Sequence, residues 1–167
     1  MRAVNYSANT PLTLRSMAFR EKEGRNGWQA LKMTFLDEYD NRFSPMFFGP
    51  KTPKERVRIN GAFRNLCIVL GMDYDLIPYQ HSFEEFVYEY IKQMKDTFGT
   101  TIFVKTLPTE VKGKKFIRLG FEPPMFSLHA NLSYTEEELL YIQGFEEEFE
   151  EIEKKKSKEL ENEEDIF

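Results

Sequence analysis

The sequence predicts a β-rich α+β domain: a five-stranded Greek-key barrel with a helical insertion between its third and fourth strands, followed by a C-terminal helix. Three observations lead to this prediction. Two pairs of segments alternate apolar and polar residues around turn sequences, two helical patterns separate these pairs, and a glutamate-rich helical pattern lies near the end of the chain. A length of 167 residues allows one substantial core and is too short for two ordinary domains.

The first predicted hairpin joins residues 12–20 to residues 28–36. The intervening residues, 23–27, are polar and include two glycines, as is typical of a turn. Side chains alternate between the two faces of a strand, so residues 28–36 divide into two sets. The set assigned to the core is Gln29, Leu31, Met33 and Phe35, and the opposite face receives Trp28, Ala30, Lys32 and Thr34.

A third strand and a second hairpin complete the predicted strands. The third strand, residues 42–48, contains Pro45 and is therefore expected at a sheet edge or a bulge. Residues 101–107 and 115–121 flank a turn and form the second predicted hairpin. Its alternation assigns Ile102, Val104, Ile117, Leu119 and Phe121 to the core and Phe103, Lys105, Phe116 and Arg118 to the opposite face.

Two helical patterns separate the hairpins. Thr52 and Ser82 each precede such a pattern and have a glutamate three residues later, which is the capping-box arrangement. The patterns end at Gly71 and Gly99, which are suitable helix stops. Three strands, a helical segment and two further strands is the element order of an OB-type barrel. A mixed α+β sandwich gives the same order and remains an alternative.

The C-terminal region differs from the rest of the chain in charge. Residues 1–133 contain 19 Lys and Arg against 14 Asp and Glu, a net charge of +5, whereas residues 134–167 contain 4 against 14, a net of −10. Ser133 and Glu136 predict the start of an amphipathic helix over residues 134–156. Residues 157–167 have the composition of a disordered acidic tail. We therefore expect an OB-like nucleic-acid-binding domain over residues 1–133, then this helix, then the tail.

Aromatic rings and cations share the predicted non-core face of both hairpins. Bases stack on rings, and Lys and Arg neutralise phosphates, so this mixture predicts a surface for single-stranded nucleic acid. A one-residue error in register would instead place the rings in the core. The predicted nucleic-acid-binding residues are Arg15, Trp28, Lys32, Phe103, Lys105, Lys112, Lys114, Lys115, Phe116 and Arg118.

The chain given ends in an acidic run followed at once by a bulky apolar pair, Ile166-Phe167. A carboxylate beside a phenylalanine ring suits a small pocket with a basic rim. This tip resembles the C-terminus of single-stranded DNA-binding proteins of bacteria and tailed bacteriophages, with Ile166 where the bacterial proteins usually carry proline. The resemblance implies an OB fold and a tip that docks onto replication and recombination proteins and competes with DNA for the basic groove. The matching residues are Glu163, Glu164, Asp165, Ile166 and Phe167.

Catalytic and metal-binding patterns have little support in the sequence. His81 and His129 are the two histidines and are far apart, and the aspartates near Asp37 and Asp73 lie in turn sequences where aspartate is common. No phosphate-binding loop or nucleophile elbow is present. We expect no enzymatic activity, no cofactor and no metal, although a metal-dependent nuclease is a distant alternative.

The remaining expectations concern location and partners. The first residues lack a signal-peptide pattern, no segment is apolar enough to span a bilayer, and the single cysteine, Cys67, fits a reducing compartment. We expect a cytoplasmic protein, in the host cytoplasm if a phage encodes it, that binds single-stranded DNA and partner proteins and no membrane. A homo-oligomer stays open. The main rival is a protein-interaction or phage structural component that binds no nucleic acid.

Overall fold

The computed structural model describes residues 5–74 and 82–164. The chain divides into two units, Met1–Ser133 and Tyr134–Phe167, which are described separately. The first unit is a β-rich α+β structure with antiparallel strands, and the second contains one long helix. The division falls at the residue where the charge of the chain changes from basic to acidic.

The main sheet is built on a long antiparallel hairpin. β1 (Thr10–Lys22) pairs with β2 (Trp28–Leu36), which confirms the first predicted hairpin. The third predicted strand is also confirmed, and it is broken around Pro45 as expected, because both of its halves pair with β2. The remaining strands of this sheet are β3 (Arg42–Phe43), β4 (Met46–Phe48), β5 (Thr101–Val104), which pairs with β1, and β8 (Phe126–Ser127), which pairs with β5.

Two helices begin at the predicted caps. α1 (Pro53–Val69) starts after Thr52, whose Oγ1 accepts the N–H of Glu55 at 3.2 Å. α2 (Phe83–Met94) starts after Ser82, whose Oγ accepts the N–H of Glu85 at 3.1 Å. A short 3-10 turn, η2 (Lys95–Thr97), follows α2. The side-chain caps satisfy backbone donors that the first turn of a helix leaves without partners.

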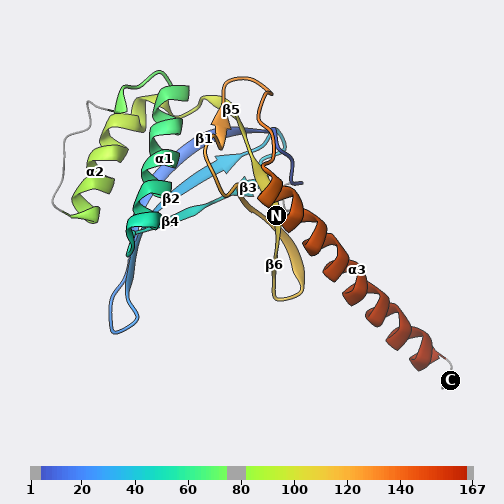
Figure 1. Cartoon of the computed structure of the whole chain (residues 1–167). Helices are drawn as coiled ribbons and strands as arrows, with labels where there is room; N and C mark the ends of the chain where they lie inside the picture. Colours follow the sequence, from blue (N-terminus) through green and yellow to red (C-terminus); the bar gives the residue numbers. More distant parts are fainter. Residues whose placement is uncertain (1–4, 75–81, 165–167) are drawn as a thin grey trace. The chain divides into compact units, whose positions relative to one another are not determined.

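The core lies between these helices and one face of the main sheet. Figure 1 shows α1 and α2 on the same side of the sheet. Inward residues of the strands and of both helices form one apolar cluster, and the hydroxyl of Tyr90 on α2 donates to the carbonyl of Phe63 on α1 at 3.0 Å. The strand residues of this cluster are Leu12, Leu14, Met17, Leu31, Met33, Phe35, Phe43, Ile102, Val104 and Phe126.

The second predicted hairpin is only partly correct. β6 (Thr106–Val111) pairs with β7 (Lys114–Leu119), but the preceding strand, β5, pairs with β1 in the main sheet. The change of partner occurs at Lys105, whose N–H donates to the carbonyl of Met125 at 2.7 Å while its carbonyl accepts the N–H of Gly120 at 2.9 Å. In the described part of the chain β6 and β7 form a separate two-stranded sheet. The described strands thus pair in one six-stranded and one two-stranded sheet, an arrangement compatible with an OB-like fold.

The C-terminal helix starts and ends later than predicted. α3 spans Glu136–Glu164, and its cap is Thr135 and not Ser133. Thr135 Oγ1 accepts the N–H of Glu138 at 3.2 Å and Glu138 Oε1 accepts the N–H of Thr135 at 2.8 Å, so the capping box lies two residues further along the chain.

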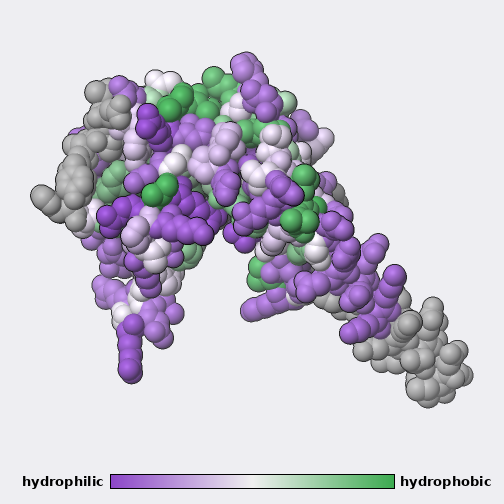
Figure 2. Space-filling view, in the orientation of Figure 1, coloured by the Kyte–Doolittle hydropathy of each residue, from purple (hydrophilic) through white to green (hydrophobic). Residues whose placement is uncertain are grey.

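The prediction of disorder from residue 157 is wrong as far as Glu164, because α3 continues to that residue. Figure 2 shows hydrophilic side chains along the coloured part of α3. Asp165, Ile166 and Phe167 lie outside the described residues. Within the described part of the chain, none of the helices combines the length and the apolar character that crossing a membrane requires.

Candidate nucleic-acid interface

The face of the main sheet that points away from α1 and α2 is rich in cations; we call it the outer sheet face. Residues paired directly across antiparallel strands point to the same face, so the register defines it. Among its described strand residues none is Asp or Glu. Its members are Pro11, Thr13, Ser16, Ala18, Arg20, Lys22, Trp28, Ala30, Lys32, Thr34, Leu36, Arg42, Met46, Phe48, Thr101, Phe103 and Ser127.

One end of the outer sheet face holds a pair of aromatic rings. Trp28 on β2 meets Phe48 on β4 edge to face, with ring centroids 5.3 Å apart. Trp28 is half-buried and Phe48 is exposed, so both rings keep surface that faces solvent. The exposed Arg20 and Lys22 of β1 stand opposite Ala30 and Trp28. Rings and cations therefore lie side by side at this end of the face.

Small side chains make up the middle of the outer sheet face. Ser16 faces Thr34, and Ala18 faces Lys32 across the β1–β2 ladder. Because these short side chains project little from the sheet, an extended polymer can approach the backbone closely. Lys32 is half-buried, and its apolar stem lies on the face between Ala18 and Met46.

The sequence-predicted residues of the main sheet lie at different places on this surface. Trp28 and Lys32 occupy the outer sheet face as expected, and neither Trp28 nor Phe103 belongs to the core cluster. Arg15 is exposed at the β-bulge where the β1–β2 register shifts. Phe103 pairs with Pro11, whereas Trp28 pairs with Lys22. Pro11 and Lys22 are eleven residues apart on β1, a separation of roughly 35 Å at the usual rise of a strand. Phe103 and Trp28 are therefore at opposite ends of the face.

The prediction that Lys105 shares an exposed face with Phe103 is wrong. Lys105 is 1% exposed, and its Nζ donates to the carbonyl of Ser133 at 3.4 Å. It occupies the break between β5 and β6, where the chain passes from one sheet to the other and the strand alternation is interrupted. Val104, Lys105 and Thr106 are consequently all buried in succession. Lys105 is a structural residue of this junction.

The β6–β7 hairpin holds the remaining predicted residues, away from the outer sheet face. Lys112 adopts a positive φ of 53° in the turn, and Lys114 and Lys115 are exposed beside it. Phe116 is 42% exposed and stands opposite Thr109. The Arg118 guanidinium lies 4.7 Å from the centre of the Phe121 ring, a cation–π contact that fixes its position.

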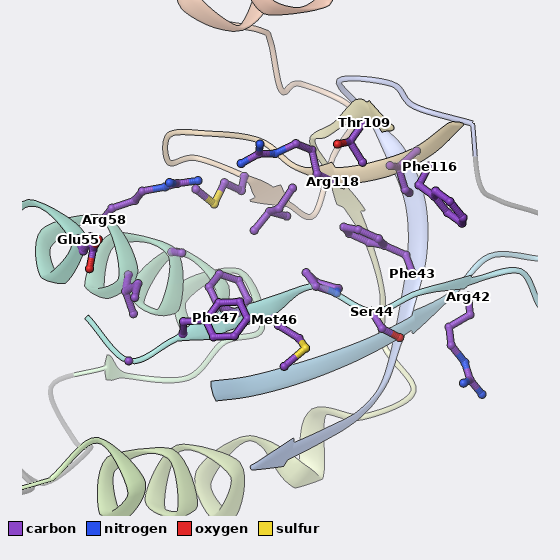
Figure 3. Close-up of a pocket in the computed structure, with 18 of the residues that line it drawn as sticks. Arg42, Phe43, Ser44, Met46, Phe47, Glu55, Arg58, Thr109, Phe116 and Arg118 are labelled. Carbon is purple, nitrogen blue, oxygen red and sulfur yellow. The ribbon is translucent and has the colours of Figure 1, made fainter. Parts of the chain in front are cut away.

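A cavity of about 780 Å³ lies between this hairpin, the β3–β4 edge and α1. Figure 3 shows Phe43 and Phe47 on one side of it, while Arg58 from α1 and Arg118 from β7 extend toward one another across it. We call it the arginine-rimmed cavity. Its apolar lining consists of Phe43, Pro45, Met46, Phe47, Phe48, Ile59, Ala62, Phe116, Ile117, Leu119 and Met125.

The charges that line the arginine-rimmed cavity are mostly positive. Arg42, Lys51, Arg58 and Arg118 contribute cations, and Glu55 is the carboxylate among the described lining residues. Glu55 Oε2 accepts the backbone N–H of Lys51 at 2.8 Å, so its charge lies at the N-terminus of α1, where it is stabilised. The cavity therefore favours an anionic group.

The two surfaces meet along the β3–β4 edge. Arg42, Met46 and Phe48 belong to the outer sheet face and also line the arginine-rimmed cavity. Sequence reasoning missed several residues of these surfaces because a single helix or short-strand position has no distinctive pattern. Alternation counted from Arg15 places Arg20 and Lys22 on the opposite face, because the β-bulge at Arg15 shifts the register of β1 by one residue. The missed residues are Arg20, Lys22, Arg42, Phe48, Lys51 and Arg58.

Comparison with known proteins adds no family to this description. No protein-family model matches the chain. The curated proteins contain no significant match to it. In the described part of the chain, no three or more His, Cys, Asp or Glu side chains are grouped so that they could hold a metal ion.

Proposed function

We propose that this protein binds single-stranded DNA without strict sequence preference and does not catalyse a reaction. The observation that carries the proposal is the outer sheet face, where Trp28, Phe48 and four cations lie on one surface without a carboxylate among its described strand residues. A polyanion with exposed bases matches both the charge and the rings of this surface. The rings would stack on the bases of such a polymer, and the cations would bind its phosphates.

The energetics favour a single strand over a duplex on this surface. A base stacked on an aromatic side chain contributes about 1–3 kcal/mol, and the bases of a duplex are already stacked on one another. Each phosphate neutralised by Lys or Arg releases counterions, which makes affinity fall as salt rises. Neither interaction reads base identity. We therefore infer a coating role, with contacts to the backbone and to the flat faces of the bases.

We propose that the fold is an OB-type barrel. A five-stranded OB barrel has a helix between its third and fourth strands, and this chain has α1 and α2 at that place in the order of its elements. On this view β5 and β6 together form the fourth barrel strand and β7 forms the fifth. The arginine-rimmed cavity then lies where the third and fifth strands would come together. We also infer that the protein acts in the cytoplasm.

We propose further that the acidic C-terminus recruits replication or recombination proteins. Its tip resembles that of single-stranded DNA-binding proteins, in which the tip docks onto partners. The residues assigned to this role are Glu163, Glu164, Asp165, Ile166 and Phe167. The negative charge of residues 134–167 keeps this segment from acting as a DNA-binding surface.

Titration of the protein with oligo-dT tests the DNA proposal. Trp28 is the single tryptophan of the chain, so quenching of its emission reports base stacking at one known position. We expect tight binding at low salt and an affinity that falls steeply between 50 and 200 mM salt. Absence of binding at low salt, or binding that ignores salt, would remove the proposal.

Matched lysine variants locate the bound strand. Lys32→Ala removes a cation from the outer sheet face, whereas Lys92→Ala removes an exposed cation from α2 in the helical layer. We expect Lys32→Ala to weaken oligo-dT binding and to reduce the salt slope by about 1, as for one lost phosphate contact. Lys92→Ala should bind like the parent protein. Equal effects of the two substitutions would contradict the assignment to the outer sheet face.

Deletion of residues 159–167 tests the recruitment proposal. The truncated protein should bind oligo-dT as tightly as the full chain or more tightly, because nine residues with net negative charge are removed. It should lose binding to a polymerase or recombination protein that the full chain captures. Weaker DNA binding after truncation would contradict this account of the tail.

A protein-interaction role without nucleic acid is a second candidate, and α3 supports it. Leu139 and Leu140 are 54% and 63% exposed, which is unusual for two adjacent leucines of a helix. An assembly component would use them for contact with another chain. Analytical ultracentrifugation of the parent protein and of a double Leu139→Ala, Leu140→Ala variant separates the two candidates. A parent protein that self-associates and binds no DNA, with a variant that no longer self-associates, would favour the assembly role.

A further inference from the structure

We propose that the arginine-rimmed cavity binds one nucleotide unit of a DNA strand, with the base inside the cavity and its phosphate between Arg58 and Arg118. The inference rests on the proposed DNA-binding function and deepens it. It replaces uniform coating by a strand that is anchored at one defined nucleotide. The ligand class is a nucleoside monophosphate, either free or within an oligonucleotide.

The size and lining of the cavity fit a base. A volume of about 780 Å³ lies within the range of about 300–1,000 Å³ that small-molecule sites occupy. Phe43, Phe47, Ile117, Leu119 and Met125 are among the apolar residues that line it. Such a lining takes a flat, weakly polar ring and rejects a bare ion, because an isolated anion would lose its hydration there.

The charges at the cavity fit a phosphate attached to that base. Arg58 and Arg118 come from different elements and extend toward one another in Figure 3. A guanidinium group donates paired N–H groups to a phosphate in a planar fork, so two arginines on one cavity offer a phosphate several charge-assisted hydrogen bonds.

One of the two arginines is already held in position. The guanidinium of Arg118 stacks on Phe121 at 4.7 Å, so part of the entropy of ordering its long side chain is lost before a ligand binds. Arg58 is exposed on α1. Arg58 is therefore the residue whose removal tests the site with little effect on the fold.

The cavity is continuous with the proposed DNA surface. Arg42 and Phe48 line the cavity and also belong to the outer sheet face. A strand anchored in the cavity can therefore cross the β3–β4 edge and continue toward Trp28, whose ring meets Phe48. This path gives the surface a fixed starting nucleotide and a direction along the sheet.

The test uses the full chain and thymidine 5′-monophosphate, with thymidine and inorganic phosphate as separate probes. Methyl NMR shifts of Ile117, Leu119 and Met125 report occupation of the cavity, and Trp28 fluorescence reports the outer sheet face. We expect the monophosphate to bind at least tenfold more tightly than either part alone. Arg58→Ala should weaken its binding about tenfold, because charge-assisted hydrogen bonds are lost, and Lys92→Ala should leave it unchanged.

The outcomes separate this inference from the function on which it rests. If the monophosphate leaves the three methyl groups unshifted while oligo-dT still quenches Trp28, the cavity site is wrong and DNA binding stands. If oligo-dT also fails to bind, the proposed function is wrong. If the monophosphate binds equally well to the parent protein and to Arg58→Ala, the assignment of its phosphate to Arg58 is overturned, and circular dichroism of the variant verifies that it is folded.

Discussion

The side chain of Asn65 makes both of the backbone hydrogen bonds that a neighbouring strand would make with Phe126. Asn65 Oδ1 accepts the N–H of Phe126 at 2.9 Å and that of Met125 at 2.8 Å, and Asn65 Nδ2 donates to the Phe126 carbonyl at 3.1 Å. A single amide on α1 thus fixes the edge strand β8, and with it Met125 in the lining of the arginine-rimmed cavity.

We expect Asn65→Ala to lower the free energy of unfolding by about 1–3 kcal/mol, because partly buried backbone groups lose their partners. Asn65→Asp keeps the acceptor for both N–H groups and loses the donor to the Phe126 carbonyl, so its loss should be smaller. Urea unfolding followed by circular dichroism measures both changes. Equal stability of Asn65→Ala and the parent protein would contradict the role of this amide.

A buried hydroxyl in the break between β3 and β4 gives a substitution that we expect to stabilise the protein. No described residue is a hydrogen-bond partner of Ser44 Oγ, which is buried. An unsatisfied buried hydroxyl costs roughly 1 kcal/mol or more, so we expect Ser44→Ala to raise the thermal unfolding midpoint by a few degrees. A lowered midpoint would mean that the hydroxyl has a partner in solution.

The turn between β2 and β3 predicts a dependence of stability on acid. Burial acts to raise the pKa of Asp37, but hydrogen bonds from the Asn41 side chain and from the Asn41 and Tyr39 backbone outweigh it, so the pKa lies below its ordinary value of 3.8. The stabilisation is therefore complete above pH 3.8 and is lost as the pH falls through the lowered pKa.

Comparison of Asp37→Asn with the parent protein isolates this contribution. The difference between their free energies of unfolding should be largest near pH 7 and should shrink as the pH is lowered toward 2. Urea unfolding at a series of pH values measures it. A difference that stays constant with pH would mean that the Asp37 carboxylate makes no charge-dependent contribution.

The single cysteine gives a test of the core. Burial raises the pKa of the Cys67 thiol to about 11, and its Sγ lies 3.6 Å from the sulfur of Met94. We expect negligible reaction of the folded protein with a disulfide reagent at pH 8 and rapid reaction in denaturant, because the thiolate is the reactive form.

The stability contributed by the neutral thiol is complete below pH 9.0, its ordinary pKa, and is lost as the pH rises through about 11. Rapid modification of the folded protein would contradict this packing.

Removal of one ring from the Trp28–Phe48 pair links the fold to the proposed function. Phe48→Ala should expose Trp28 to more water, shift its emission to longer wavelength and weaken oligo-dT binding by about one stacked base. Tyr88→Ala is the matched control. Tyr88 is an exposed ring on α2, and its centroid lies 5.3 Å from that of the Phe19 ring. An equal loss of oligo-dT affinity in both variants would argue against a specific role for the pair.

Local patterns were sufficient for much of the fold. The caps at Thr52 and Ser82, the β1–β2 hairpin and the interruption of the third strand at Pro45 depend on neighbours within a few residues, so they follow from the sequence. The cap of α3 was misplaced because Ser133 and Thr135 are each followed by glutamate three residues later, and only the hydrogen bonds select Thr135.

The amino-acid sequence alone was enough to assign the two faces of β2, the starts of α1 and α2 and the change of charge at residue 133, because strand period, capping chemistry and charge are properties of short segments. Tertiary structure decided that Lys105 is buried, that β5 leaves β6 to join β1, and that Arg58 and Arg118 line the same cavity. These facts depend on how segments distant in sequence pack, and no local pattern encodes that packing. The outer sheet face likewise exists only because the β1–β2 and β2–β4 registers bring its cations and rings to one side of the sheet.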